Sequence, residues 1–127
     1  MQVLEYDITT PFDVDRTLVF WVPVGQEPPK NALEIDYYGE KVFVVPHEEH
    51  VQLLKATMAR GRGVLVWSGN GYKWAHNVLK ALGFTDKDPI YVMSKPAGYV
   101  DDLPCNEWMG NRIYIKPHSN PYSENDI

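Results

Sequence analysis

The stretch Gly63-Val-Leu-Val-Trp-Ser68, followed by Gly69-Asn-Gly71, decides the predicted fold. Its apolar residues run without alternation, which is typical of a strand buried on both faces of a parallel sheet. A helix is predicted directly afterwards, over residues 72–82, with Gly83 as its C-terminal signal. A strand, a short turn and a helix in succession are the repeating unit of α/β proteins. We therefore predict an α/β fold with a central, mostly parallel sheet flanked by helices.

Further elements are predicted on both sides of this unit, because strand, helix and turn signals alternate along the chain. The hairpin is predicted where Gly39-Glu40 separates two alternating runs. The N-terminal helix is predicted where apolar residues recur at helical spacing. These elements are a strand around Phe12 to Val14, a hairpin at residues 33–45, a helix from His47 to Ala59, and strands at Ile90 to Met93, Gly98 to Asp102 and Asn111 to Ile115.

The length of 127 residues fits one domain, which we place at residues 1–116, with residues 117–127 as a loosely held polar tail. The formal net charge of -5 disfavours binding to long nucleic acids or anionic membranes, which requires a basic face. A single cysteine, Cys105, excludes an internal disulfide framework and a cysteine-rich zinc site. No apolar run approaches the roughly 18 residues of a membrane span, and no signal pattern opens the chain. A cytoplasmic protein that does not bind membranes is therefore expected.

Polar or charged side chains stand where four of the predicted strands end. In an open parallel sheet, ligands bind beyond the carboxyl ends of the strands, where the loops diverge. Carboxylates gathered there would repel one another, so they indicate a divalent cation, and oxygen ligands favour Mg²⁺. These side chains are, in chain order, Asp13 and Asp15, Ser68, Lys95, and the pair Asp101-Asp102.

The four groups resemble the four motifs of the haloacid dehalogenase superfamily of phosphohydrolases. The first motif of that family stands here as Asp13-Val-Asp15-Arg-Thr17. The second, a serine or threonine that ends the next core strand, matches Ser68, and the third, a lysine, matches Lys95. The fourth, an acidic pair after an apolar strand, matches Asp101-Asp102. All four occur in the order of the family, over residues 12–104. The resemblance implies a single Rossmann-like domain and a Mg²⁺-dependent phosphatase.

The resemblance also implies catalytic roles. Asp13 is expected to attack phosphorus and form an aspartyl-phosphate. Asp15 is expected to protonate the leaving group and then to activate water. Ser68 is expected to hydrogen-bond a phosphoryl oxygen, and Lys95 to offset the charge of the nucleophile and the phosphoryl group. Gly69-Asn-Gly71 is either a nest of N–H groups for the phosphate, with Gly69 in contact, or a tight strand-to-helix turn.

The metal site implied by the resemblance involves the same carboxylates. Mg²⁺ is expected to bind the side chains of Asp13 and Asp102 and the main-chain carbonyl of Asp15. Asp101 is expected beside them. The sequence leaves open which of Asp101 and Asp102 contacts the metal directly. Related dehalogenases lack an acid at the position of Asp15, so its presence favours phosphate over halide chemistry.

The chain departs from the family pattern at two positions and lacks one of its parts. Arg16 stands where glycine is commonest, and Pro11 interrupts the apolar run before the nucleophile. Neither interval between the motifs can house a cap domain, so the hairpin at 33–45 is interpreted as a minimal flap. An open site of this kind suits a bulky substrate, or a homo-oligomer in which a neighbouring subunit covers the site. Four aromatic residues near the flap, for which packing is favoured over stacking on a base or ring, are Phe20, Trp21, Tyr37 and Tyr38.

Small phosphomonoesters are the first expected substrates. A terminal 3′-phosphate on a polynucleotide is the alternative within enzymes, and the acidic net charge disfavours it. A binding or regulatory protein that keeps the fold but turns over poorly is the alternative outside enzymes. The pair in His47-Glu-Glu-His50 has a spacing that invites a zinc hypothesis, but a helix start explains it better.

Overall fold

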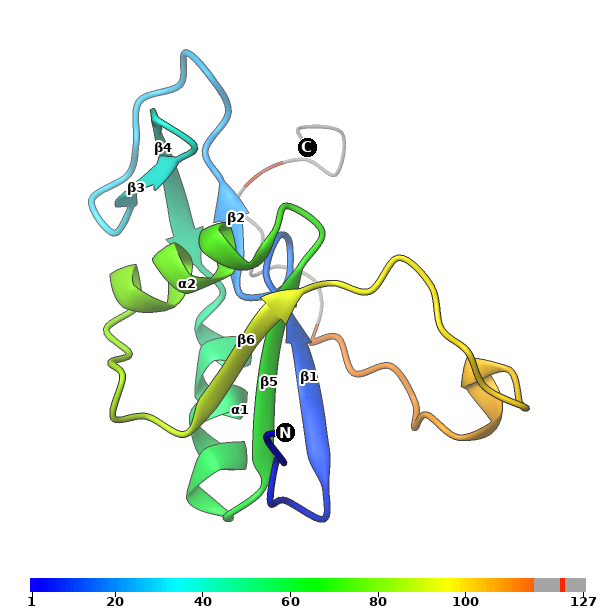
Figure 1. The fold of residues 1–127 in the computed structure, drawn as a ribbon. Helices are drawn as coiled ribbons and strands as arrows, with labels where there is room; N and C mark the ends of the chain where they lie inside the picture. The colour runs from blue at the N-terminus through cyan, green and yellow to red at the C-terminus, as the bar shows by residue number, and fades with distance from the viewer. Residues whose placement is uncertain (116–121, 123–127) are drawn as a thin grey trace.

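The computed structural model of the protein describes residues 1–115 and 122. Its larger sheet has three parallel strands, β1 (Thr9–Asp13), β5 (Gly63–Ser68) and β6 (Ile90–Ser94), in the order β1-β5-β6. β5 occupies the centre, with Asp13 opposite Trp67 on one side and Ser94 opposite Ser68 on the other (Figure 1). The prediction of an α/β fold with a parallel sheet is confirmed, and the carboxyl ends of the three strands lie side by side.

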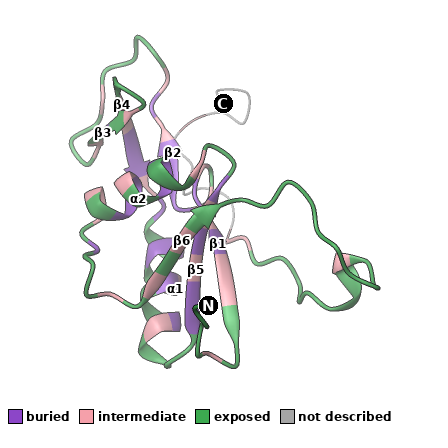
Figure 2. Ribbon diagram, viewed as in Figure 1, coloured by how far each residue is buried: buried purple, intermediate pink, exposed green. Residues whose placement is uncertain are grey.

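Two helices, α1 (Glu48–Ala59) and α2 (Tyr72–Ala81), pack against the same face of this sheet. That face carries Phe12, Val64 and Val66, which form one core with apolar side chains of both helices. The alternate residues of β5, Leu65 and Trp67, point to the opposite face and are only half-buried (Figure 2). Both helices were predicted within one residue of their observed bounds, because their apolar residues recur at helical spacing.

A second, antiparallel sheet forms the flap and has the order β2-β4-β3. β3 (Leu33–Tyr37) and β4 (Glu40–Pro46) make the predicted hairpin, and β2 (Val19–Trp21) adds a strand that was not predicted. The hairpin turns at Tyr38 and Gly39, whose φ angles are 50° and 93°. Two successive positive φ angles are typical of a type I′ turn, which usually has asparagine rather than tyrosine at its first central position.

The first strand begins earlier than predicted and includes Pro11. Proline has no N–H to donate to a strand ladder, so it is tolerated at sheet edges. Among the described residues, β1 has a strand partner on one side only, β5, and the missing donor of Pro11 is accommodated there. The interruption that Pro11 makes in the apolar run therefore does not prevent the strand that ends at Asp13.

The predicted strands at 98–102 and 111–115 are wrong. Residues 98–102 belong to an exposed segment that extends away from the sheet and contains a short 3₁₀ turn, Cys105–Glu107 (Figure 1). Only Lys95 to Ala97 separate the predicted strand from β6, whereas a crossover between parallel strands ordinarily takes a dozen residues or more. Residues 111–115 also form no strand, and the main chain of Ile115 instead hydrogen-bonds to two histidine rings.

In the part of the chain that the structure describes, no helix has the length and apolar character needed to cross a membrane. The predicted tail at 117–127 lies outside the described residues, apart from Tyr122, which packs against the cluster of Phe20, Val22 and Val45.

Candidate active site

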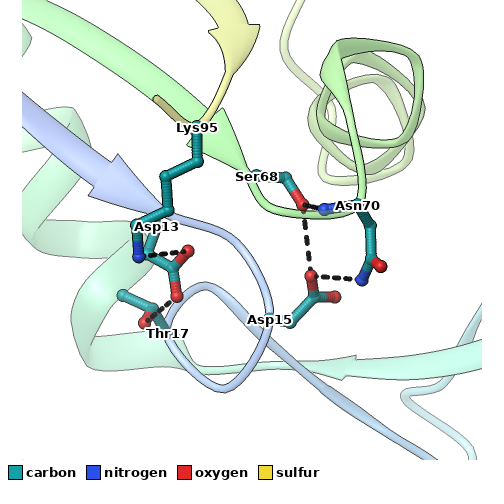
Figure 3. Close-up of polar contacts among 6 residues, drawn as sticks. All are labelled: Asp13, Asp15, Thr17, Ser68, Asn70 and Lys95. Atoms are coloured by element: carbon teal, nitrogen blue, oxygen red, sulfur yellow. Dashed lines mark hydrogen bonds and ion pairs between the residues drawn. The ribbon is translucent and has the colours of Figure 1, made fainter. Parts of the chain in front are cut away.

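Asp13 ends β1 and lies at the carboxyl edge of the sheet, as predicted. Its Oδ2 accepts a hydrogen bond from the Thr17 hydroxyl over 3.1 Å, and its Oδ1 lies 3.6 Å from the Lys95 Nζ (Figure 3). The Asp13 side chain is one-third exposed and that of Lys95 is half exposed. Asp13 is therefore accessible from solvent and faces a cation that comes from beyond β6.

A tight turn after β1 places Asp15 on the other side of the site. Val14 accepts main-chain hydrogen bonds from Leu18 over 2.8 Å and from Thr17 over 3.2 Å, which fold the chain back on itself. Arg16 takes the left-handed conformation in this turn, with φ of 63°. Glycine adopts that conformation without strain, whereas residues with a side chain adopt it rarely. The Arg16 side chain is exposed.

The carboxylate of Asp15 accepts hydrogen bonds from four side chains. Its Oδ1 accepts from the indole N–H of Trp21 over 2.7 Å and from that of Trp74 over 2.9 Å. Its Oδ2 accepts from the Ser68 hydroxyl over 3.2 Å and from the Asn70 amide nitrogen over 2.9 Å (Figure 3). The site therefore brings Asp15 together with Ser68 as predicted, and adds three donors that were not predicted as site residues.

Ser68 is fully buried at the end of β5 and organises the loop that follows. Its Oγ accepts from the Asn70 main-chain N–H over 3.0 Å, and its carbonyl accepts from Gly71 and Lys95 over 3.0 and 2.9 Å. The last of these contacts fixes Lys95 beside the end of β5, although its side chain reaches across to Asp13. Gly69 lies exposed in the same loop.

The tip of the flap closes onto this loop. Tyr37 donates its hydroxyl to Asn70 Oδ1 over 3.2 Å, and the Tyr38 hydroxyl donates to the Asn70 carbonyl. The Tyr37 ring also contacts the rings of Trp21 and Trp74, each with a centroid distance of 5.1 Å. The packing role favoured for Trp21, Tyr37 and Tyr38 is thus accompanied by polar contacts with the site.

Gly71 is required where the flap meets the loop. Its φ of 101° and ψ of 161° are accessible almost only to glycine, and a Cβ there would lie 2.5 Å from the Tyr38 hydroxyl oxygen. We expect Gly71→Ala to lower the free energy of unfolding by about 2 kcal/mol, measured by urea denaturation. Gly69→Ala is the matched control, because Gly69 has open space around it and no positive φ. Equal effects of the two substitutions would contradict both the positive φ of Gly71 and its close approach to Tyr38.

Two buried histidines, His47 and His50, connect the turn that follows β1 with the main chain of Ile115. His50 donates from Nδ1 to the Thr17 carbonyl over 2.7 Å and accepts at Nε2 from the Ile115 N–H over 2.8 Å. His47 caps α1 by accepting from the His50 N–H, and its Nε2 donates to the Ile115 carbonyl over 3.0 Å. The two rings stack with a centroid distance of 3.8 Å. All four ring nitrogens are occupied, so the helix-start interpretation is supported over the zinc hypothesis.

The protonation of His50 is constrained by the same contacts. Burial lowers the pKa of His50 below its ordinary value of 6.5, and the nearby His47 adds to this effect. The hydrogen bond to the Thr17 carbonyl and the charge of Glu49 act in the opposite direction. His50 is therefore held as the neutral tautomer with its proton on Nδ1.

The predicted metal ligands Asp101 and Asp102 are not brought to the site. They lie in the exposed segment that extends from β6, where Asp101 caps its own loop by accepting from the Leu103 N–H. Within residues 1–115 and Tyr122, no group of three or more histidine, cysteine, aspartate or glutamate side chains is placed to hold a metal ion. The site thus provides two carboxylates, Asp13 and Asp15, with Lys95 as a counter-charge.

Three donors to Asp15 were missed by sequence reasoning. Trp74 lies in the helix predicted over residues 72–82, where its ring is buried in the core while its N–H reaches the carboxylate. Trp21 lies in a strand that was not predicted, and Asn70 was considered only as part of a glycine-rich turn.

Comparison of the chain with known proteins finds no matching family model, no matching curated protein and no matching solved structure.

Proposed function

We propose that this protein is a phosphatase of the haloacid dehalogenase type, which hydrolyses phosphomonoesters through an aspartyl-phosphate on Asp13. The observation that carries the proposal is the convergence of Asp13, Asp15, Ser68 and Lys95 at the carboxyl ends of three neighbouring parallel strands. Three of the four motifs recognised in the sequence meet there. The finer description of the fold as a capless, Rossmann-like domain of that superfamily belongs to the same proposal.

In the proposed reaction each of these side chains has one step. Asp13 is exposed and carries a carboxylate oxygen that can attack phosphorus, which forms the acyl phosphate and releases the alcohol or phenol. The Lys95 ammonium offsets negative charge on the nucleophile and on the transferred group. Ser68 can rotate its hydroxyl from Asp15 toward a phosphoryl oxygen. Asp15 donates a proton to the leaving oxygen and then accepts one from the water that attacks the acyl phosphate.

Mg²⁺ is the proposed cofactor. The Asp13 carboxylate and the Asp15 main-chain carbonyl are the groups that would hold it. This donor set is small but compatible with Mg²⁺, which usually keeps several waters and is bound by one or two carboxylates together with substrate phosphates. Bound there, the ion supplies positive charge that draws a phosphate group toward the Asp13 carboxylate. Asp102, with Asp101 beside it, would join this ligand set only if the exposed segment reached the site.

The proposed substrates are small phosphorylated molecules. Among the described residues the three-stranded flap lies beside the site and the Lys95 side chain is half-exposed, so a substrate can enter from the side of Lys95. A polynucleotide end is the alternative, disfavoured by the net charge of -5. Binding to short DNA ends that weakens steeply with salt would favour that alternative. The proposed assembly is a homo-oligomer in which a second copy of the chain covers the open site.

Hydrolysis of an aryl phosphate, measured with Mg²⁺ and with excess EDTA, tests the proposal. We expect turnover with Mg²⁺ and a loss of more than about 100-fold in EDTA, because the ion offsets charge that the Lys95 ammonium alone does not neutralise. Quenching the reaction in acid and treating it with hydroxylamine should release phosphate from the protein, as an acyl phosphate does. Folded protein without turnover on aryl and alkyl phosphates would instead favour a binding or regulatory role.

A further inference from the structure

The two oxygens of the Asp15 carboxylate have different partners. Oδ1 is approached by the indole nitrogens of Trp21 and Trp74, whereas Oδ2 is approached by Ser68 and Asn70. An indole N–H can donate a hydrogen bond but cannot accept one. A proton on Oδ1 would therefore face two N–H groups and displace at least one of them.

Oδ2 has a partner that tolerates a proton. The Ser68 hydroxyl can accept as well as donate, so it can rotate and accept from a protonated Oδ2. It can equally turn to a phosphoryl oxygen, in which case Oδ2 keeps the Asn70 amide as its donor and has its other position open to the leaving group. We infer that Trp21 and Trp74 are positioning residues, which fix the Asp15 carboxylate and confine its acid–base proton to Oδ2. This inference rests on the proposed function for the catalytic use of that proton.

The flap holds this arrangement in place. Trp21 belongs to the flap strand β2, and its ring contacts that of Trp74 with a centroid distance of 5.1 Å. Tyr37, in flap strand β3, packs against both indoles and donates to Asn70 Oδ1. The contact with Tyr37 orients the Asn70 amide so that its nitrogen faces Asp15 Oδ2. A substrate that lifts the flap would thus loosen the donors to both oxygens at once.

The proton accounting of the reaction follows from this assignment. As an Asp13 oxygen bonds to phosphorus and the bond to the leaving oxygen breaks, the proton on Asp15 Oδ2 passes to that oxygen. Asp15 is then a carboxylate whose Oδ1 is stabilised by the two indoles. In the second step Oδ2 takes a proton from the attacking water, which breaks the acyl phosphate and returns the enzyme to its initial state.

The hydrogen bonds can be tested without any activity. In an ¹H–¹⁵N NMR spectrum, the indole resonances of Trp21 and Trp74 should lie downfield of those of Trp67 and Trp108, since among residues 1–115 and 122 only the first two indoles donate to a carboxylate. Asp15→Ala should move these two resonances upfield and leave the other two in place, and Trp→Phe variants assign them. Unchanged indole resonances in Asp15→Ala would overturn the inference, whatever the enzyme does.

The catalytic role is tested by the dependence on the leaving group. In Trp21→Phe and Trp74→Phe we expect kcat/KM to fall about tenfold on an alkyl phosphate and less than about threefold on an aryl phosphate, which needs little acid assistance. Trp108→Phe, in the exposed segment, is the matched control and should change neither value. Equal losses on both substrates would mean that the indoles have a structural role only. Intact indole resonances in a protein without turnover would contradict the proposed function and leave the hydrogen-bonded arrangement standing.

Discussion

Asp13→Asn is expected to lower turnover of phosphomonoesters by a factor on the order of 10⁴ or more, because an amide oxygen is a poor nucleophile toward phosphorus. The substitution keeps the size of the side chain and an acceptor for the Thr17 hydroxyl. The ion pair that it removes, with Lys95, is exposed enough to add little to stability. The free energy of unfolding should therefore change by less than about 0.5 kcal/mol, measured by urea denaturation.

Glu34→Gln provides the matched control for this prediction. It removes an exposed ion pair with Lys41 in the flap, at 3.8 Å, and leaves the site untouched. Turnover of Glu34→Gln should stay within about twofold of that of the unmodified protein, since surface substitutions away from the site have small effects. Turnover that survives Asp13→Asn would show that another group attacks phosphorus.

The position of the site could be predicted from the sequence because it follows from topology. Strands that run parallel in one sheet end at one edge, so residues that close three such strands are brought together whatever the details of packing. Asp13, Ser68 and Lys95 needed only the correct strand assignments, which short apolar runs with clear turn signals supplied. The order of the sheet, with β5 between β1 and β6, then sets Ser68 between the other two.

The surroundings of Asp15 could not be predicted in this way. Trp21 and Trp74 lie 53 residues apart in the chain and meet on one oxygen only because the flap sheet packs over α2. The apolar pattern that places Trp74 in the core says nothing of where its N–H points. The placement of Asp101-Asp102 at the sheet edge was wrong because it relied on a local pattern that resembles a strand end. The segment between this pattern and β6 is too short for a parallel crossover.

His50→Ala is expected to lower the free energy of unfolding by about 3 kcal/mol, because it leaves two main-chain groups without their partner and opens a cavity. These groups are the Thr17 carbonyl, in the turn that carries Asp15, and the Ile115 N–H. His76→Ala is the matched control, since His76 lies on the exposed face of α2. It should change the free energy of unfolding by less than about 0.5 kcal/mol. A similar loss in both variants would contradict the stabilising role of the His50 hydrogen bonds to Thr17 and Ile115.

The same contacts give stability a dependence on pH. Neutral His50 accepts from the Ile115 N–H at Nε2, and a proton there would turn an acceptor toward a donor. Burial lowers the pKa of His50 in the folded protein, so the unfolded chain binds the proton more readily. The contribution of His50 is thus fully present above its ordinary value of 6.5 and is lost as the pH falls through 6.5 toward the lowered value.

Urea denaturation at several pH values between 8 and 5 measures this loss in the unmodified protein and in His50→Ala. The groups that face the His50 ring are the stacked His47, the Tyr114 ring, and Glu49 on its own helix. His50→Ala should therefore reduce the acid sensitivity of the free energy of unfolding. An undiminished pH dependence in that variant would assign the effect to other groups, because a residue that is absent cannot take up the proton.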